Sequence, residues 1–196
     1  TVCGIVGHFL NVPLSYMLKK INKTIYSSLT ATLILLLIGC LSASWLVSGV
    51  IPAMIYYGID IMHPSYFLVA TTILCSVVSL ATGSSWSTIA TVGVAIVGIG
   101  QAFGMIEAIV AGAIVSGAYF GDKMSPMSDT TNLAATVAGT DLFTHIRYMI
   151  YTTGPTYILS LIIYAVIGIF MAGEGTINET TIMKAAIEES FNVTPW

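Results

Sequence analysis

The feature that most constrains the fold of this chain is the length of its uncharged tracts. Residues 31–59 and 148–173 contain no Asp, Glu, Lys, Arg or His, and residues 64–106 contain no Asp, Glu, Lys or Arg. An α-helix needs about 20 apolar residues to cross roughly 30 Å of hydrocarbon. Only 8% of the residues are charged, against roughly 25% in ordinary soluble domains. The sequence therefore predicts an integral, multi-pass protein of the cell membrane, in contact with membrane lipid.

We expect one transmembrane helix over residues 31–59 and another over residues 148–173. The tract 64–103 is long enough for two helices, and small polar residues from Gly83 to Thr88 interrupt it near its midpoint. A complete helical hairpin with a tight turn is one interpretation, and a re-entrant hairpin whose tip stops inside the membrane is the other. The predicted fold class is an all-α polytopic membrane protein that contains such a hairpin.

A polar segment follows a tract that is too short to cross a membrane alone. The tract is Ala108–Gly121, and residues 121–132 read Gly-Asp-Lys-Met-Ser-Pro-Met-Ser-Asp-Thr-Thr-Asn. The tract becomes long enough only if it continues through this segment to about Gly139. Pro126 removes a backbone donor and disfavours helix at the preceding residue, so we expect a discontinuous transmembrane helix that is non-helical over 121–132. Such backbone at membrane depth must be buried in protein or line a watery cavity. A plain loop in water is the alternative.

The polar segment has the chemistry of a small-cation site. Hard cations that shed water bind oxygen ligands, and carboxylates in a partly buried setting also bind protons, so one site can hold either a cation or a proton. The oxygen-bearing side chains available are Asp122, Ser125, Ser128, Asp129, Thr130, Thr131 and Asn132.

No pattern of an enzyme site or of a cofactor site is present in the sequence. The three histidines lack the mutual spacing of a metal site, residues 83–87 lack the Gly-x-Ser-x-Gly pattern of a nucleophile elbow, and the phosphate-loop pattern is absent. The net charge of −3 gives no indication of a nucleic-acid partner. We therefore expect no enzymatic activity, no cofactor and no bound nucleic acid.

The few cations predict an orientation. Lys19, Lys20 and Lys23 form the one basic cluster of the sequence, and Arg147 is the next candidate cytoplasmic anchor. Both lie on one side of the membrane if residues 31–59 cross outward, 64–103 return to their own side, and 105–139 cross back.

Two further patterns concern packing and the end of the chain. The spacings of Gly100 with Gly104 and of Gly117 with Gly121 permit close helix contact, either within the chain or as a homodimer face. The polar tail 174–196 carries Met183, Ile187 and Phe191 at near-helical spacing, which predicts a surface helix. The predicted organisation is a membrane domain over 1–173, followed by this polar segment over 174–196.

Five stretches together carry a resemblance. They are Ser-Ala-Ser-Trp at 42–45, Pro-Ala-Met-Ile-Tyr-Tyr-Gly at 52–58, Ser-Leu-Ala-Thr-Gly-Ser-Ser-Trp-Ser-Thr at 79–88, the segment 117–133, and the segment 138–151. Over roughly residues 30–172 the chain resembles the NhaC-type sodium/proton antiporter family. The departures are Ser85 and Ser87, where Thr and Gly are common, and Met127, where Leu is common.

The resemblance implies a secondary transporter built from two inverted repeats, each with a hairpin and a broken helix, in chains more than twice this length. The present chain is expected to be a fragment that holds about one repeat, and a complete site is expected to need the missing second repeat. Sodium/proton exchange is the expected function. Exchange of organic acids such as malate and lactate is an alternative within the same class, and a non-transporting scaffold or channel subunit is an alternative from another class.

On this basis the ion site is assigned as follows. Asp129 is the first choice for the carboxylate that is shared by Na+ and H+, and Asp122 is the second. Further ligands are expected from Ser125, Thr130 and Asn132, and the hairpin tip is expected to form the opposing wall of the ion pathway through Ser84, Ser85, Trp86 and Thr88.

Overall fold

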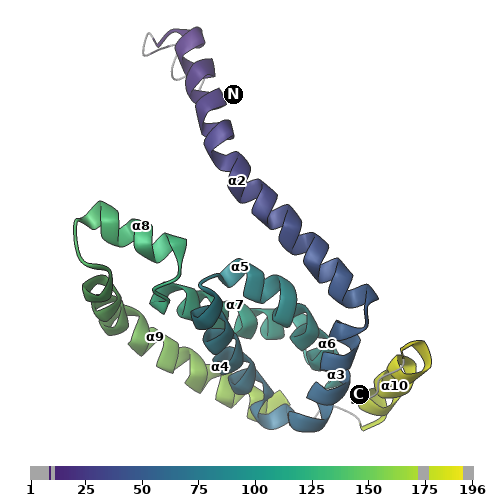
Figure 1. The fold of residues 1–196 in the computed structure, drawn as a ribbon. Helices are drawn as coiled ribbons and strands as arrows, with labels where there is room; N and C mark the ends of the chain where they lie inside the picture. The colour runs from purple at the N-terminus through teal and green to yellow at the C-terminus, as the bar shows by residue number, and fades with distance from the viewer. Residues whose placement is uncertain (1–8, 10–11, 172–176, 192–196) are drawn as a thin grey trace. The chain divides into compact units, whose positions relative to one another are not determined.

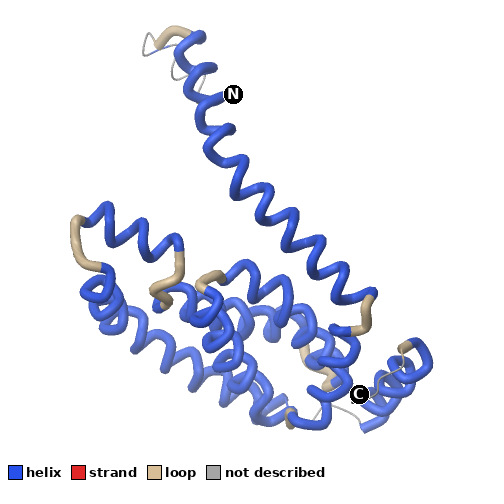
Figure 2. The backbone as a smooth tube through the Cα atoms, viewed as in Figure 1, coloured by secondary structure: helices blue, strands red, loops and turns tan. Residues whose placement is uncertain are grey.

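The computed structural model describes residue 9, residues 12–171 and residues 177–191. Every regular element within these ranges is a helix, so the all-α prediction is confirmed for them (Figures 1 and 2). The chain divides into two compact units, residues 1–40 and residues 41–196. The helices are α2 (Leu14–Val47), α3 (Val50–Ile61), α4 (Pro64–Thr82), α5 (Ser85–Thr88), the π-helix η1 (Ile89–Gly93), α6 (Val94–Ala102), α7 (Glu107–Met124), α8 (Asp129–Ala138), α9 (Leu142–Met171) and α10 (Ile177–Ser190).

The apolar tract 31–59 differs from its prediction as one helix. It forms the end of α2 and most of α3, which are separated by Ser48 and Gly49. Gly49 has a φ of +84°, a left-handed conformation that L side chains rarely adopt, and it ends the first helix. A glycine within an apolar tract resembles any other small membrane residue, so the pattern did not indicate this break.

The described residues contain enough spans for a polytopic membrane protein. Three helical stretches are long and apolar enough to cross a membrane: Pro64–Thr82, Ser85–Ala102 and Leu142–Met171. The bent pair of Thr32–Val47 and Val50–Ile61 adds a fourth if the pair counts as one span. The first two stretches form the predicted hairpin, which turns at Gly83 and Ser84. The third begins before the predicted residue 148, because the Asp141 side chain caps it by accepting hydrogen bonds from the amides of Phe143 and Thr144 (3.1 and 3.2 Å).

Helix α7 packs closely on α4 because of its glycines. A side chain at Gly117 would overlap the carbonyl of Thr72, and one at Gly121 would overlap the carbonyl of Ser76. At the same contact the Ser79 hydroxyl donates to the carbonyl of Ala118 (2.5 Å). The predicted small-residue spacing of 117 and 121 therefore serves packing within the chain. The buried apolar core around it includes Phe67, Leu68, Val110, Ala113 and Ile114.

Helix α9 is joined to this pair by tyrosine hydroxyls. The Tyr157 hydroxyl lies 2.7 Å from the Ser76 hydroxyl of α4, and the Tyr164 hydroxyl lies 3.0 Å from the Ser116 hydroxyl of α7. The Tyr157 ring also stacks on Phe120, with 3.9 Å between the ring centroids. Most other side chains of α9 are exposed, as expected for a helix that faces lipid.

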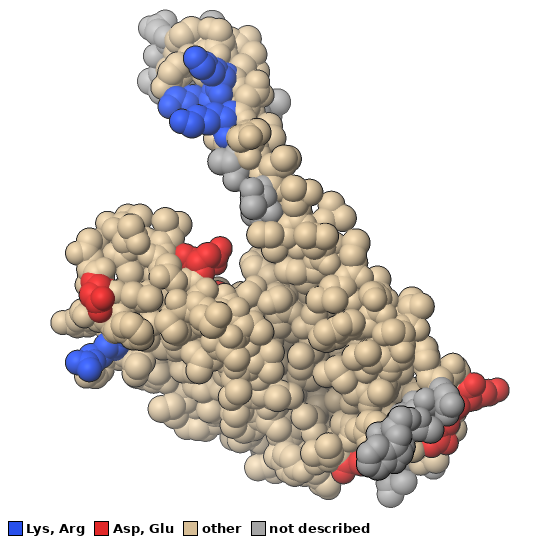
Figure 3. Space-filling view, in the orientation of Figure 1, with Lys and Arg blue, Asp and Glu red and all other residues tan. Residues whose placement is uncertain are grey.

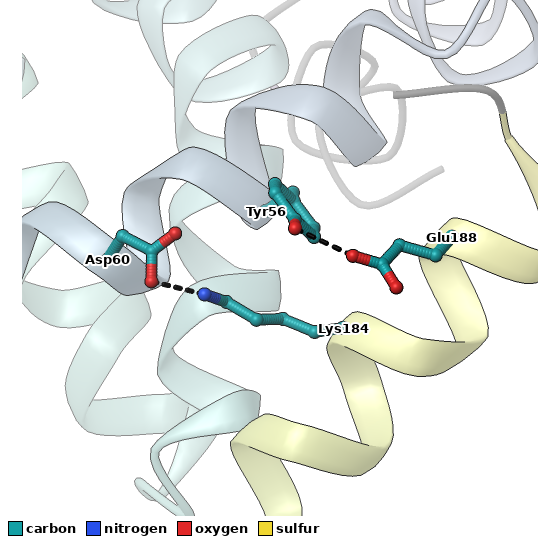
Figure 4. A network of polar contacts seen from close by, with 4 residues as sticks. All are labelled: Tyr56, Asp60, Lys184 and Glu188. Atoms are coloured by element: carbon teal, nitrogen blue, oxygen red, sulfur yellow. Dashed lines mark hydrogen bonds and ion pairs between the residues drawn. The ribbon is translucent and has the colours of Figure 1, made fainter. Parts of the chain in front are cut away.

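Helix α10 lies along α3 through polar contacts (Figure 4). Lys184 pairs with Asp60, and the Tyr56 hydroxyl donates to a carboxylate oxygen of Glu188 (2.7 Å). The Phe191 ring lies beside Gly49. Since partners with rising numbers on α10 meet falling numbers on α3, the two helices run antiparallel.

The surface helix that the sequence predicted in the polar tail is present over 177–190. Met183 packs against the apolar core, and Ile187 and Phe191 are half-buried. Residues 172–176 and 192–196 of the predicted tract and tail lie outside the described residues.

Candidate ion-binding site

The predicted break in the polar segment is present but is shorter than 121–132. Helix α7 continues through Gly121, Asp122 and Lys123 to Met124, and α8 begins at Asp129, so the non-helical residues are 125–128. Pro126 lies inside this break, as expected from its missing donor. The polar residues before Met124 remain helical because Gly121 and Asp122 are buried at the end of α7, where Gly121 packs on α4.

The hairpin tip lies against this break, as the sequence analysis predicted. Gly83 ends α4 with a φ of +70°, and a Cβ atom there would lie 2.7 Å from the carbonyl carbon of Met127. Glycine thus meets both the conformational and the steric requirement at this position. Ser125, which is fully buried, donates to the carbonyl of Leu80 (2.8 Å) and accepts from the amide of Met127 (3.2 Å).

Asp122 is the buried carboxylate of the site, with 5% of its surface exposed. The hydroxyl of Ser85, at the start of α5, donates to Asp122 Oδ2 at 3.4 Å. The hydroxyl of Thr131, in the first turn of α8, donates to the backbone carbonyl of the same residue (3.2 Å). Helix α5, which is distant in sequence, and α8, which follows α7 directly, therefore both contact the last turn of α7.

Asp129 lies in a different setting. It is exposed, it occupies the first turn of α8, and its Oδ1 accepts a hydrogen bond from the amide of Thr130 (2.7 Å). A carboxylate at a helix N-terminus is stabilised by the amide groups that point toward it. Burial thus distinguishes the two candidate carboxylates. Asp122, the second choice of the sequence analysis, is buried, and Asp129, the first choice, is exposed.

Lys123 contacts neither candidate carboxylate in the part of the chain that the structure describes. Its Nζ donates to the Thr130 hydroxyl (3.1 Å) and lies 5.1 Å from the centroid of the Tyr119 ring. Thr130 also exchanges a hydrogen bond with the Ser128 hydroxyl (3.0 Å). Lysine and hydroxyls therefore form a polar rim beside the break.

The remaining predicted site residues stabilise the turns or lie exposed. Asn132 donates to the carbonyls of Pro126 and Ser128 (2.8 and 2.7 Å), which holds the chain of the break in place. In the tip, Ser84 caps α5 and its carbonyl accepts from the Thr88 hydroxyl (3.0 Å). Trp86 has 66% of its surface exposed.

The helix ends define the electrostatics of the break. The carbonyls at the C-terminal end of α7 carry partial negative charge, and the amides at the N-terminal end of α8 carry partial positive charge. Within the described residues no group of three or more His, Cys, Asp or Glu side chains is placed to hold a metal ion. A cation at this break would therefore depend on one carboxylate together with hydroxyl and carbonyl oxygens, which suits a weakly held alkali cation.

The sequence analysis did not predict that α4 forms a polar contact with α7 next to the site. Thr72, Ser76 and Ser79 are buried and follow one another at helical spacing on the face that meets α7. Hydroxyls at i, i+4 and i+7 in an apolar tract are the signal that could have indicated a polar contact surface. Thr131, which is 2% exposed, was noted as an oxygen donor but was not assigned to the site.

Comparisons with known proteins extend over the whole chain. The Na+/H+ antiporter family matches residues 117–196. The chain is 39% identical over 200 residues to the malate-2H+/Na+-lactate antiporter of Bacillus subtilis (strain 168), covering 100% of this chain and 43% of that protein. It is 39% identical over 192 residues to the Na+/H+ antiporter NhaC of Alkalihalophilus pseudofirmus, covering 98% and 41% respectively.

A third relative extends the range of named substrates. The chain is 44% identical over 149 residues to the arginine/ornithine antiporter ArcD of Halobacterium salinarum, covering 76% of this chain and 31% of that protein. No solved structure matches the chain. The chain spans about two fifths of the length of the first two relatives.

Proposed function

We propose, because this chain is a homologue of NhaC-type Na+/H+ antiporters, that the whole protein exchanges sodium ions for protons across the membrane. The relatives are transporters rather than enzymes, and the chain is an integral membrane protein with up to four spans. The energy for exchange would come from an ion gradient. The described helices would supply one part of the transport path, and the second repeat that the family resemblance implies would supply the rest.

The observation that carries the proposal is the buried Asp122 between the hairpin tip and the helix break. A charged side chain at membrane depth costs free energy unless it is paired, and such residues usually mark ion pathways. Either a proton or a sodium ion cancels the charge of one carboxylate, and the two compete for it. Competition for one group is sufficient for exchange.

Neutrality of the loaded site would also prevent leakage. With Na+ or H+ bound, Asp122 carries no net charge, and the site can change its exposure from one side to the other at low electrostatic cost. With neither bound, the buried negative charge disfavours that change. An ion must therefore be bound each time the protein changes state.

The neighbouring oxygens would replace the water that sodium sheds. The Ser85 hydroxyl already lies at hydrogen-bonding distance from the Asp122 carboxylate, and the Thr131 hydroxyl bonds the Asp122 carbonyl at the end of α7. Thr130 and Asp129, at the more open side of the break, would meet the ion first. In this assignment Asp122 is the shared carboxylate, and Asp129 is an accessory carboxylate on the entry path.

Exchange of organic acids is a second candidate. The Bacillus subtilis relative, named for malate, protons, sodium and lactate, is 39% identical over the full length of this chain. The same carboxylate would then couple sodium and protons to the movement of an organic anion, whose binding groups would lie outside the features described above.

The test uses the full-length protein in inside-out membrane vesicles. Addition of Na+ is expected to move protons in the wild type, and Asp122→Asn is expected to abolish this movement, since asparagine keeps the shape but neither titrates nor carries charge. Asp141→Asn, a matched change at an exposed helix cap, should leave exchange intact. Normal exchange by Asp122→Asn would contradict the assignment. A requirement for added malate or lactate would favour the second candidate, and sodium flux without proton movement would favour a channel.

A further inference from the structure

Helix α2 is longer than a membrane span. It has 34 residues, which is about 51 Å at 1.5 Å per residue, whereas about 20 residues cross the hydrocarbon layer. The last 20 residues of α2, from residue 28 to Val47, contain no charged residue and are long enough to cross that layer. Residues 14–26 therefore lie beyond the span, and all of their side chains are exposed except that of Met17, which is half-buried.

Residues 14–26 of α2 present two chemically different faces on opposite sides of the helix. A helix advances about 100° per residue, so residues at i, i+3, i+4 and i+7 share a face. One face is basic and aromatic, and the side directly opposite is aliphatic. The first consists of Tyr16, Lys19, Lys20 and Lys23, and the second of Leu14, Leu18, Ile21 and Ile25, and all eight side chains are exposed.

The basic face is concentrated in space. The four side chains line one pocket of about 340 Å³, and Lys20 Nζ lies 5.5 Å from the centroid of the Tyr16 ring. Figure 3 shows the basic side chains at the N-terminal end of α2 gathered together. A phosphate group could be approached by several ammonium groups at once on such a face.

No acidic residue stands near these lysines in the sequence. The first acidic residue of the chain is Asp60, and all nine acidic residues follow the lysine cluster. The chain has six Lys and Arg against nine Asp and Glu, so residues after Lys23 carry 3 − 9 = −6 and the cluster carries +3. The basic charge is thus segregated to the segment that adjoins the membrane.

We propose that residues 14–26 form a binding surface for the headgroups of anionic phospholipids. The lysines contact the phosphates, the Tyr16 ring occupies the headgroup layer, and the aliphatic face settles at the boundary of the acyl chains. An amphipathic segment with lysines on its polar face and leucine and isoleucine opposite has the properties of an interfacial helix. An acidic protein surface or a nucleic acid would match the charge of the lysines but offers no acyl-chain layer in which the aliphatic face could be buried.

The experiment compares lipids at the surface of the full-length protein. The protein is reconstituted in phosphatidylcholine vesicles that contain spin-labelled phosphatidylglycerol or spin-labelled phosphatidylcholine, and the fraction of lipid immobilised by the protein is measured. The wild type is expected to prefer phosphatidylglycerol. The triple variant Lys19→Gln, Lys20→Gln, Lys23→Gln is expected to lose this preference. At low salt, the affinity for phosphatidylglycerol relative to phosphatidylcholine should fall by up to roughly five-fold for each lysine replaced. High salt should reduce the preference of the wild type toward that of the variant.

Two controls keep the result interpretable. Replacing the same three lysines by arginine keeps the charge and should retain the preference, and Lys184→Gln removes a cation elsewhere and should leave it unchanged. An unchanged preference in the triple glutamine variant would overturn the proposal. An equal loss of the phosphatidylglycerol preference in Lys184→Gln would also overturn it. So would displacement of the lipid by inorganic phosphate, if phosphate displaced more lipid than chloride does at equal ionic strength. None of these outcomes depends on ion exchange, so the two proposals can fail separately.

Discussion

Two breaks in the apolar helices that the structure describes, at Ser48–Gly49 and at 125–128, differ in how the hydrogen bonds of their backbone are completed. At Ser48–Gly49 the chain bends through a left-handed glycine, and its hydrogen bonds stay local: the Ser48 amide donates to the Ser44 carbonyl (2.9 Å) and the Ala53 amide to the Gly49 carbonyl (2.9 Å). At 125–128 the chain contains a proline, and side chains complete the hydrogen bonds: Ser125 bonds the Leu80 carbonyl of α4 and the Met127 amide, and Asn132 of α8 donates to the Pro126 carbonyl.

The comparison shows that a break is not by itself a site. No acidic residue lies within residues 31–59 around the first break, and the close neighbour of Gly49 is the Phe191 ring. The second adjoins a buried carboxylate and is held by polar contacts with the hairpin tip. We interpret the first as a bend in a span and the second as the place where an ion binds. Four predictions test that distinction, in order of expected effect.

The largest difference is expected for alanine at the two turn glycines. Gly83→Ala combines a positive φ with a contact of 2.7 Å to the Met127 backbone, which cannot move aside, so a loss of about 3 kcal/mol in stability is expected. Gly49→Ala meets the ring of Phe191 at 3.1 Å, and a side chain can shift, so about 1 kcal/mol is expected. Thermal unfolding of both variants in detergent measures the difference, and equal losses would show that the tip does not constrain the break.

The second difference concerns two serines. Ser125→Ala removes a fully buried hydroxyl that bonds both the Leu80 carbonyl and the Met127 amide, so a loss of about 2 kcal/mol is expected. Ser48→Ala removes an exposed hydroxyl at 3.3 Å from the Trp45 carbonyl and is expected to change stability by less than about 0.5 kcal/mol. The same unfolding assay applies. A neutral Ser125→Ala would mean that its hydrogen bonds do not hold the break in place.

The third prediction separates the two carboxylates of the second break. Asp129→Asn leaves the buried carboxylate in place and is expected to weaken sodium-driven proton movement by roughly ten-fold, chiefly through a higher sodium requirement, which corresponds to about 1.4 kcal/mol. Initial rates over a range of sodium concentrations test this against Asp122→Asn, which should be inactive at every concentration. Complete loss in Asp129→Asn with residual exchange in Asp122→Asn would reverse the two roles.

The smallest effect is expected at the polar contacts that hold α10 beside the first break. Asp60→Lys and Lys184→Asp should each lower stability slightly, and the double variant should recover the loss, because the pair is restored in reverse. The Asp60 side chain is 57% exposed and that of Lys184 is 23% exposed, so solvent screening limits the coupling to about 0.5 kcal/mol. A double-mutant cycle measures this coupling. Additive losses of stability would show that the Asp60–Lys184 ion pair does not help to hold α10 against α3.

Much of the fold followed from pattern and composition. The apolar tracts predicted the two arms of the hairpin, Pro64–Thr82 and Ser85–Ala102, and all of α9 except its first six residues, and Pro126 predicted a break in the helix after residue 108. Hydrophobic periodicity carries no information about a positive φ, so the bend at Gly49 was missed. The boundaries of the second break were too wide, since polar residues such as Asp122 and Lys123 can remain helical when packing and hydrogen bonds support them.

The candidate site was predictable in its parts but not in its arrangement. Residue chemistry pointed to the two carboxylates and to the tip as their neighbour, and the tip does meet the break. The order of Asp129 and Asp122 could not be read from the sequence, because the burial of a side chain depends on which helix packs against it.

The sequence alone determined that the chain lies in lipid, that its elements are helices and which chemical groups are available: long uncharged tracts predict helices in lipid, and Pro126 among carboxylates and hydroxyls predicts a polar break. Only the tertiary structure decided which groups meet. Gly117 and Gly121 bring α7 against α4, and that contact places Ser85 beside Asp122 while Asp129 stays exposed. The physical reason is that composition and periodicity are local properties of the chain, whereas burial and hydrogen-bond partners are set by segments that are distant along it.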